Sequence, residues 1–306
     1  MAKKRRASAR LQQRAQEEVD ATAGADDVDE GETAAQQPEN KPVELDKFVE
    51  GFEIPYNDKT VLCERRGKAG KPSLIFTHGA GGGLAAPATK EFADGFAGRA
   101  GIVSFQGAMS LPSRTKTFHA VMEHEDFDEA LGGRSMGARA ACIAATQQER
   151  QTKALVLVSF PLVGGKKGDS REQILLDLPE NVDVLFVSGT RDTMCDLEQL
   201  EGVMSRMVAP SWLVTVDAAN HGMDWKWKKS AEEMRRMTGA IAADWLESRD
   251  KDKHRCLVRW DEEADEIRNL GWEQSEKAME HVGKMNSPVE GGEAKNPPVK
   301  KRKVRK

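Results

Sequence analysis

A serine, an aspartate and a histidine occur in this chain in an order and in settings that suit nucleophilic chemistry. Ser135 is the centre of a G-x-S-x-G pentapeptide between a short apolar stretch and an alanine-rich segment. Asp192 follows the apolar run 184–189, and His221 follows the apolar run 212–216. A serine hydroxyl is a weak nucleophile until a base takes its proton. His221 would be that base, and Asp192 would orient the imidazole and stabilise its charged form.

Asp217 is an alternative acid for this set, because it also precedes His221. It lies only four residues before the histidine. Asp192 is preferred because it falls just past the end of a strand-like run, where side chains that carry out chemistry collect in open parallel sheets.

The loop that contains Ala80 and Gly81 predicts hydrogen-bond donors for a developing oxyanion. The sequence His-Gly-Ala-Gly-Gly-Gly, at 78–83, follows the compact apolar run 73–77. One backbone N–H is expected from Met136, directly after the serine, and a second from Ala80, with Gly81 as the next choice. Losing one such donor in other hydrolases costs about 3 kcal/mol of barrier.

The elements that must position these residues alternate between strands and helices. Further apolar runs predict strands at 102–105 and 154–158, and a hairpin is expected over 52–63. Helices are expected at 89–99, 114–123 and 230–246. Strands that are apolar on both faces, separated by helix-length segments, indicate a parallel sheet covered on both sides. With serine, acid and histidine in this order, we expect the α/β-hydrolase fold, with a mostly parallel central sheet and helices on both faces.

Two segments depart from the usual pattern of this fold. The strand before Ser135 is expected at 127–131, where it is short and more acidic than a central strand should be. The segment 160–178 is too short for a large cap, so we expect a minimal cap over an open, shallow site. Such a site would suit small or protruding acyl groups, and a strong preference for long-chain over short-chain esters would contradict this.

The composition divides the chain into three parts. Of its 306 residues 31% are charged, and the polar residues gather at both ends. We expect a disordered basic-then-acidic tail at 1–44, the hydrolase domain at 45–249, and a charged extension at 250–306. Within that extension, 256–282 is interpreted as a short amphipathic helix.

The chain ends in a dense basic run that follows two prolines. Lys300, Lys301, Arg302 and Lys303 are typical of a one-part nuclear import signal. We therefore expect a nuclear or nucleo-cytoplasmic protein with an import receptor as a partner. Phosphate contact with nucleic acid and a merely solvated tail are the alternatives. An unchanged distribution after deletion of 297–306 from a fluorescent fusion would remove the idea, unless the basic N-terminus is redundant.

Other chemistries have less support. His119, Glu123 and His124 could be drawn as a metal site, but they are interpreted as a solvated helix face, and no metal is expected. None of the four cysteines forms a C-x-x-C pair, and no apolar run approaches 18 residues, so no membrane partner is expected. No cofactor is expected, because a serine triad needs none.

Four strings together are similar to a known family. THGAGGG, GGRSMGARAA, SGTRDTMC and NHGM resemble the α/β-hydrolase-like proteins of the testis-expressed-thirty and NSL-complex-subunit-three type, which are relatives of dienelactone hydrolases. The resemblance covers about 48–245 and implies Ser135 as nucleophile, Asp192 as acid and His221 as base. It also implies a non-catalytic alternative, because one relative is a scaffold in a chromatin-associated complex.

The residues predict a serine hydrolase that cleaves an ester, thioester or similar acyl bond of a small acyl substrate through an acyl-enzyme. The alternative is an interaction protein that uses the same fold in a nuclear, chromatin-associated complex. Direct nucleic-acid binding is disfavoured, because the core lacks the basic and aromatic platform that single-strand binders need.

Overall fold

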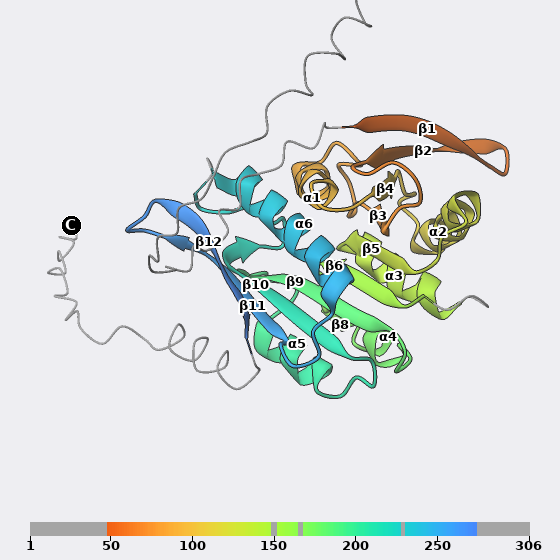
Figure 1. Cartoon of the computed structure of the whole chain (residues 1–306). Coiled ribbons are helices and arrows are strands. Elements are labelled where there is room, and N and C mark those ends of the chain that lie inside the picture. The colour runs from red at the N-terminus through yellow and green to blue at the C-terminus, as the bar shows by residue number, and fades with distance from the viewer. Residues whose placement is uncertain (1–47, 148–151, 165–167, 228–229, 274–306) are drawn as a thin grey trace, which may run out of the picture. The chain divides into compact units, whose positions relative to one another are not determined.

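Short apolar runs, buried on both faces, form the centre of one ten-stranded sheet (Figure 1). The computed structural model describes residues 48–147, 152–164, 168–227 and 230–273. The strands of the sheet are β1 (Val49–Tyr56), β2 (Lys59–Arg66), β3 (Leu74–Thr77), β4 (Ile102–Phe105), β5 (Ala130–Arg134), β6 (Ala154–Val158), β9 (Asp183–Arg191), β10 (Ser211–Asn220), β11 (Arg255–Asp261) and β12 (Glu266–Glu273).

The sheet is parallel at its centre and antiparallel at its edges. Its order is β1-β2-β4-β3-β5-β6-β9-β10-β11-β12. Every pair from β4–β3 to β10–β11 in this order is parallel, whereas the pairs β1–β2, β2–β4 and β11–β12 are antiparallel. The carboxyl ends of β5, β9 and β10 therefore lie at one edge of the layer, where open parallel sheets hold their ligand sites.

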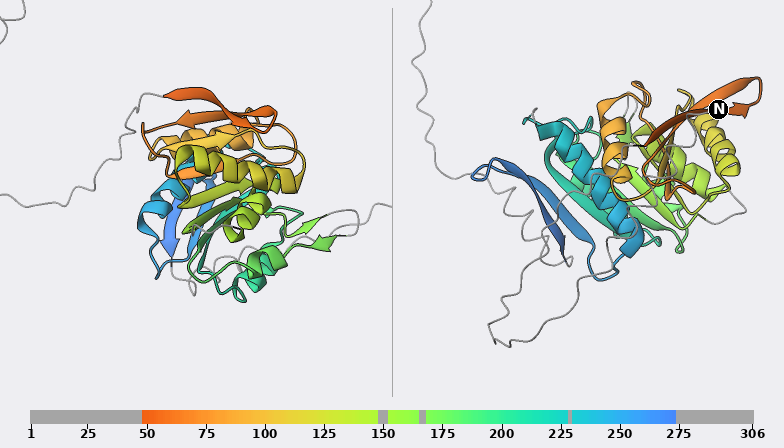
Figure 2. Two further views of the ribbon diagram at one scale, coloured as in Figure 1. Left: turned by 90° about the vertical axis from the view of Figure 1, so that its right-hand side faces the viewer. Right: turned by 45° about the horizontal axis from the view of Figure 1, so that its top comes forward.

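Helices cover both faces of this sheet, which confirms the predicted fold class (Figures 1 and 2). They are α1 (Pro87–Ala97), α2 (Leu111–Glu125), α3 (Met136–Thr146), α4 (Gln173–Leu176), α5 (Leu197–Met204) and α6 (Ala231–Ser248). The helices α1 and α6 pack on each other over one face, and α2 and α3 pack together on the other. In α3, Ala138, Ala141 and Ala144 are fully buried, so small side chains bring this helix close to the strands.

The packing of α1 on α6 depends on two glycines. A methyl group at Gly95 would collide with the backbone of Arg236, and one at Gly239 would collide with the carbonyl of Phe92. The missing side chains let the two backbones approach at the crossing, in the way that glycine permits close contact between chains.

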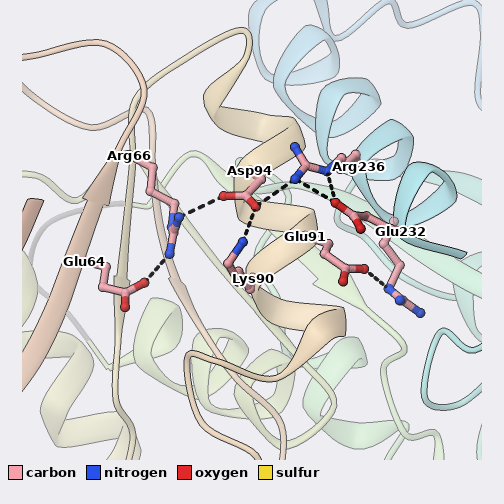
Figure 3. Close-up of polar contacts among 8 residues, drawn as sticks. Glu64, Arg66, Lys90, Glu91, Asp94, Glu232 and Arg236 are labelled. Atoms are coloured by element: carbon pink, nitrogen blue, oxygen red, sulfur yellow. Dashed lines mark hydrogen bonds and ion pairs between the residues drawn. The ribbon is translucent and has the colours of Figure 1, made fainter. Parts of the chain in front are cut away.

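A polar network lies beside this crossing (Figure 3). The Asp94 carboxylate of α1 accepts hydrogen bonds from Arg66 of β2 at 2.8 Å, Lys90 at 2.8 Å and Arg236 of α6 at 3.3 Å. Arg66 also binds Glu64. One half-buried carboxylate thus links the edge hairpin, α1 and α6.

The strand before Ser135 lies three residues later than the sequence predicted. It is β5 (Ala130–Arg134), so Asp128 and Glu129 precede the strand rather than forming part of it. A methyl group at Gly132 would lie 2.7 Å from the Val156 carbonyl oxygen. The absence of a side chain at Gly132 is what lets this segment fit against β6.

The expected helix at 256–282 is wrong for its described part, and so is the end of the domain at residue 249. Cys256 and Val258 are 3% and 0% exposed, whereas Leu257 and Arg259 are half-buried, which is the period-2 pattern of a strand. The strand β11 pairs with β10, and the hairpin with β12 continues the same sheet to Glu273.

The segment after β6 is small, in line with the expected minimal cap. It holds a two-stranded ribbon, β7 (Val163–Gly164) and β8 (Asp169–Ser170), and then the single-turn helix α4. None of the helices in the described ranges is both long and apolar enough to cross a membrane. The predicted tail at 1–44 and the basic run at 300–303 lie outside the described residues and stay predictions.

Candidate active site

Ser135 occupies the sharp turn between β5 and α3. Its backbone has φ 52° and ψ −110°, in a region that non-glycine residues rarely adopt. The Ser135 N–H donates to the Val158 carbonyl of β6 at 2.9 Å, which holds the turn against the neighbouring strand. The residue is 8% exposed. Such backbone strain concentrates where a side chain must be presented for chemistry.

The glycines on either side of this turn have steric roles. A methyl group at Gly133 would collide with the backbone of Gly137. A methyl group at Gly137 would lie 2.5 Å from the Thr77 carbonyl oxygen and 2.7 Å from that of His78. The turn therefore closes on itself and on the end of β3, which explains the G-x-S-x-G spacing.

The structure brings the three predicted residues together. Ser135 Oγ lies 2.9 Å from His221 Nε2, and His221 Nδ1 lies 2.9 Å from both Asp192 oxygens. The Nδ1–H donates to the carboxylate, so Nε2 is left to accept from the serine hydroxyl. The Asp192 side chain is 0% exposed and that of His221 is 19% exposed. The base thus faces solvent on one side while its acid partner is sealed in protein.

Asp192 is held in place from its own loop. It follows the last residue of β9, and its Oδ1 accepts from the Met194 N–H at 2.8 Å. Asp217, the alternative acid, does not contact the histidine in this arrangement. Its Oδ1 accepts from the Thr190 hydroxyl at 3.2 Å.

The histidine loop is fixed by two further residues. Arg134, beside the nucleophile, donates from Nη2 to the His221 carbonyl. Asn220 Oδ1 accepts from the N–H groups of Gly222 at 2.8 Å and Asp224 at 3.0 Å. Burial lowers the pKa of Arg134, while the nearby carboxylates of Asp192 and Asp224 act in the opposite direction. From its place beside the nucleophile, Arg134 could be expected to meet an anionic substrate group or to form a structural salt bridge; the structure shows instead a hydrogen bond to a backbone carbonyl.

The loop after β3 lies against the nucleophile. A methyl group at Gly79 would be 3.4 Å from Ser135 Cβ. Ala80 follows it and is exposed, and Gly81 has φ +87°, a conformation that favours glycine. No described residue accepts a hydrogen bond from the N–H of Ala80 or Met136. Both N–H groups can therefore donate to an oxyanion, which is the role that the sequence predicts for them.

Two residues that the sequence analysis did not single out support this loop. Arg114 of α2 is fully buried, and its guanidinium donates to the carbonyls of His78 and Gly79. His78 is 1% exposed, and its ring lies between Gly79 and Gly107. Their partners are backbone atoms, which leave no pattern of residue types. The loop motif includes His78, but no sequence signal pointed to Arg114 or to the role of either side chain.

The weaker candidates lie apart from the triad. His119 Nε2 is 3.5 Å from the Ala144 carbonyl oxygen, and His124 Nδ1 is 3.1 Å from Glu125 Oε1. Within the described ranges, no group of three or more potential ligands is arranged to hold a metal ion. Trp225 packs against Trp227 and Trp260 after the histidine loop.

Comparison with known proteins supports the same class. Residues 108–247 match the family model described as an alpha/beta hydrolase domain. A dienelactone hydrolase from Anabaena variabilis is 12% identical with a TM-score of 0.53, covering 66% of this chain and 97% of that one. Est1E from Butyrivibrio proteoclasticus is 14% identical with a TM-score of 0.52, covering 64% and 99%. The esterase domain of a Rhodothermus marinus protein is 13% identical with a TM-score of 0.50, covering 65% and 99%.

These matches and the strand order show the α/β-hydrolase fold. At such low identity these solved structures show the fold alone, and the function depends on the geometry of the site.

Proposed function

We propose that this protein is a serine hydrolase that cleaves an ester, thioester or similar acyl bond. The observation that carries the proposal is the continuous hydrogen-bonded chain from Ser135 Oγ through His221 to the buried carboxylate of Asp192, with 2.9 Å at each link. This is the arrangement that activates a serine hydroxyl in unrelated folds.

The proposed reaction has two halves. Ser135 Oγ attacks the acyl carbon while His221 Nε2 takes the hydroxyl proton, and the resulting imidazolium is stabilised by Asp192. The N–H groups of Met136 and Ala80 would hold the oxyanion. The leaving group departs with the proton from His221, and water then attacks the acyl-enzyme with His221 again as base.

The small segment between β6 and β9 supports a small acyl group as substrate. The described part of this segment offers only a two-residue ribbon and a four-residue helix, α4, to cover the site. A panel of esters of increasing chain length would test this, and a preference for the long-chain members would contradict it.

We further propose membership of the testis-expressed-thirty and NSL-complex-subunit-three group. The support is that its four characteristic strings fall on the loop after β3, the serine turn, the end of β9 and the histidine loop. A profile comparison of these segments in which other hydrolase groups score better would contradict this placement.

A fluorophosphonate probe, which reacts with activated serines, tests the main proposal. We expect the purified full chain to be labelled, and we expect Ser135→Ala and His221→Ala to abolish the labelling while keeping the thermal unfolding midpoint within a few degrees. A well-folded but unlabelled wild type would contradict the hydrolase proposal. It would favour the interaction protein, and the partners of the full chain would then be sought.

A further inference from the structure

Arg114 is a buried cation without an acidic partner. It is 0% exposed, and within the described ranges no carboxylate lies at ion-pair distance from it. Burial lowers its pKa to about 10, so it remains charged at neutral pH. Burying an unpaired charge is strongly unfavourable unless hydrogen bonds compensate it. The role of Arg114 should therefore depend on its guanidinium group, which an apolar side chain such as leucine lacks.

Its hydrogen bonds all go to backbone carbonyls of two loops at the carboxyl ends of β3 and β4. Nη1 donates to His78 and, at 3.2 Å, to Gly79. Nη2 donates to Gly107 at 3.2 Å, and Nε donates to Ala108 at 2.9 Å. A planar guanidinium can satisfy several acceptors in fixed directions, which a lysine ammonium cannot reproduce.

His78 also forms hydrogen bonds to both of these loops. Its Nε2 accepts from the Gly107 N–H at 3.0 Å, so the ring proton is on Nδ1. That Nδ1–H donates to the Gly79 carbonyl at 2.6 Å. Burial and the Arg114 charge both lower the pKa of His78, which favours the neutral ring, and the Gly107 N–H selects this tautomer. The Gly79 carbonyl is therefore held from two directions.

The direction of this carbonyl fixes the direction of the next N–H. The described part of the chain has no cis peptide bond, and in a trans peptide the C=O and the following N–H point opposite ways. Because Arg114 and His78 draw the Gly79 oxygen into the protein, the Ala80 N–H is turned outward. Gly79 lies against Ser135, and Ala80 is exposed at that surface.

We propose that Arg114 is the positioning residue of the oxyanion loop: it holds the Gly79–Ala80 peptide so that its N–H faces the oxygen of the tetrahedral intermediate at Ser135. This rests on the proposed hydrolase function and adds to it the residue that orients the second donor. Arg114 does not touch the substrate, and it acts through the peptide that it holds.

The experiment compares Arg114→Lys and Arg114→Met with Arg66→Lys in the full chain. Arg66 is a matched control, because it is 6% exposed but forms ion pairs with Glu64 and Asp94 instead of holding a loop. Two quantities are measured: the second-order rate of fluorophosphonate labelling, and amide hydrogen exchange in a peptide that spans 78–83.

We expect labelling to slow about a hundredfold in Arg114→Met, at the lower end of the range found when an oxyanion donor is lost, and about tenfold in Arg114→Lys, which keeps a charged donor. Exchange in 78–83 should rise in both variants while the rest of the sheet keeps its protection. Arg66→Lys should change neither quantity. The lysine variant keeps a charge at this position, and it decides the question if the methionine variant does not fold.

Wild-type labelling rates in Arg114→Lys, or unchanged exchange in 78–83, would overturn the proposal. A general rise in exchange across the sheet would also overturn it, because the role would then be in folding only. An unlabelled wild type would instead contradict the hydrolase function, while exchange would still show whether Arg114 holds the loop.

Discussion

At the scale of single residues, the side chains of the triad differ in their exposure to solvent. His221 retains a solvent-facing side, whereas Asp192 is sealed and fixed by the Met194 N–H. A carboxylate in such a position stays aligned with the imidazole without having to be reorganised during the reaction.

Asp192 and Asp217 both precede His221 in the chain, and the structure predicts a large loss of labelling from substitution of the first and almost none from the second. Asp192→Asn should slow fluorophosphonate labelling about 10³-fold or more, because an amide favours the wrong imidazole tautomer. Asp217→Asn should stay within about twofold of wild type, because an amide oxygen can still accept from the Thr190 hydroxyl. Labelling rates of both purified variants check this, and a larger loss in Asp217→Asn would reverse the assignment.

The triad could be predicted from the sequence, whereas its supports could not. Ser135, Asp192 and His221 each follow an apolar run, and their chain order is informative in itself. Arg114 and Arg134 act on carbonyls of residues distant in the chain, and a carbonyl belongs to every residue type. Only the fold shows which carbonyls they meet.

At the scale of elements, the closest contact between helices is the crossing of α1 and α6. Gly95 and Gly239 let the two backbones touch, and the Asp94 network beside them links both helices to β2 (Figure 3). The helix α6 follows the histidine loop directly, and Arg235 of α6 donates to the Met223 carbonyl of that loop at 2.9 Å. Arg235 thus links α6 to the loop that carries His221.

Two alanine substitutions in helices should have opposite effects on stability. Gly239→Ala should destabilise the protein by about 2–3 kcal/mol, because the methyl group must displace the Phe92 backbone. Gly202→Ala in α5 should stabilise it by about 0.5–1 kcal/mol, because nothing lies within 4 Å and alanine favours helix. Urea unfolding measures both, and equal effects in the two variants would contradict this account of the crossing.

The elements that the sequence predicted well are those with long apolar or periodic runs, such as β6 and α6. It placed β5 too early, because two consecutive glycines within the strand hide its apolar pattern. It missed β11 and β12, because an edge hairpin with one covered face carries many charges and resembles an amphipathic helix. In both cases packing against neighbouring strands overrides local preference.

At the scale of the whole molecule, the thiols are spread through the described core. Cys63, Cys142, Cys195 and Cys256 are all free and buried, in positions from β2 to β11. Burial raises the pKa of Cys63, Cys195 and Cys256 from the ordinary value of 9.0 to about 12, and it raises that of Cys142 as well. These thiols are therefore neutral in the native state at any ordinary pH.

Thiol alkylation should consequently report unfolding of the whole domain. At pH 8 we expect iodoacetamide to modify the native protein slowly at all four cysteines, and to react quickly in denaturant. The raised pKa values also mean that stability from these groups is present below pH 9 and is lost as the pH rises toward 12. Fast modification of one cysteine in the native state would show a local opening there.

The hairpin of β11 and β12 also limits where the chain can be shortened without exposing the edge of β10. A premature stop codon or a protease cut after residue 249 would remove the neighbour of β10 and break the hydrogen bond from Trp212 to the Asp250 carbonyl. The open edge of β10, with Val214 and Val216 fully buried in the intact protein, would then be a template for another chain. Such a fragment should collect in the insoluble fraction of an expressing cell, although all three residues of the triad would still be present.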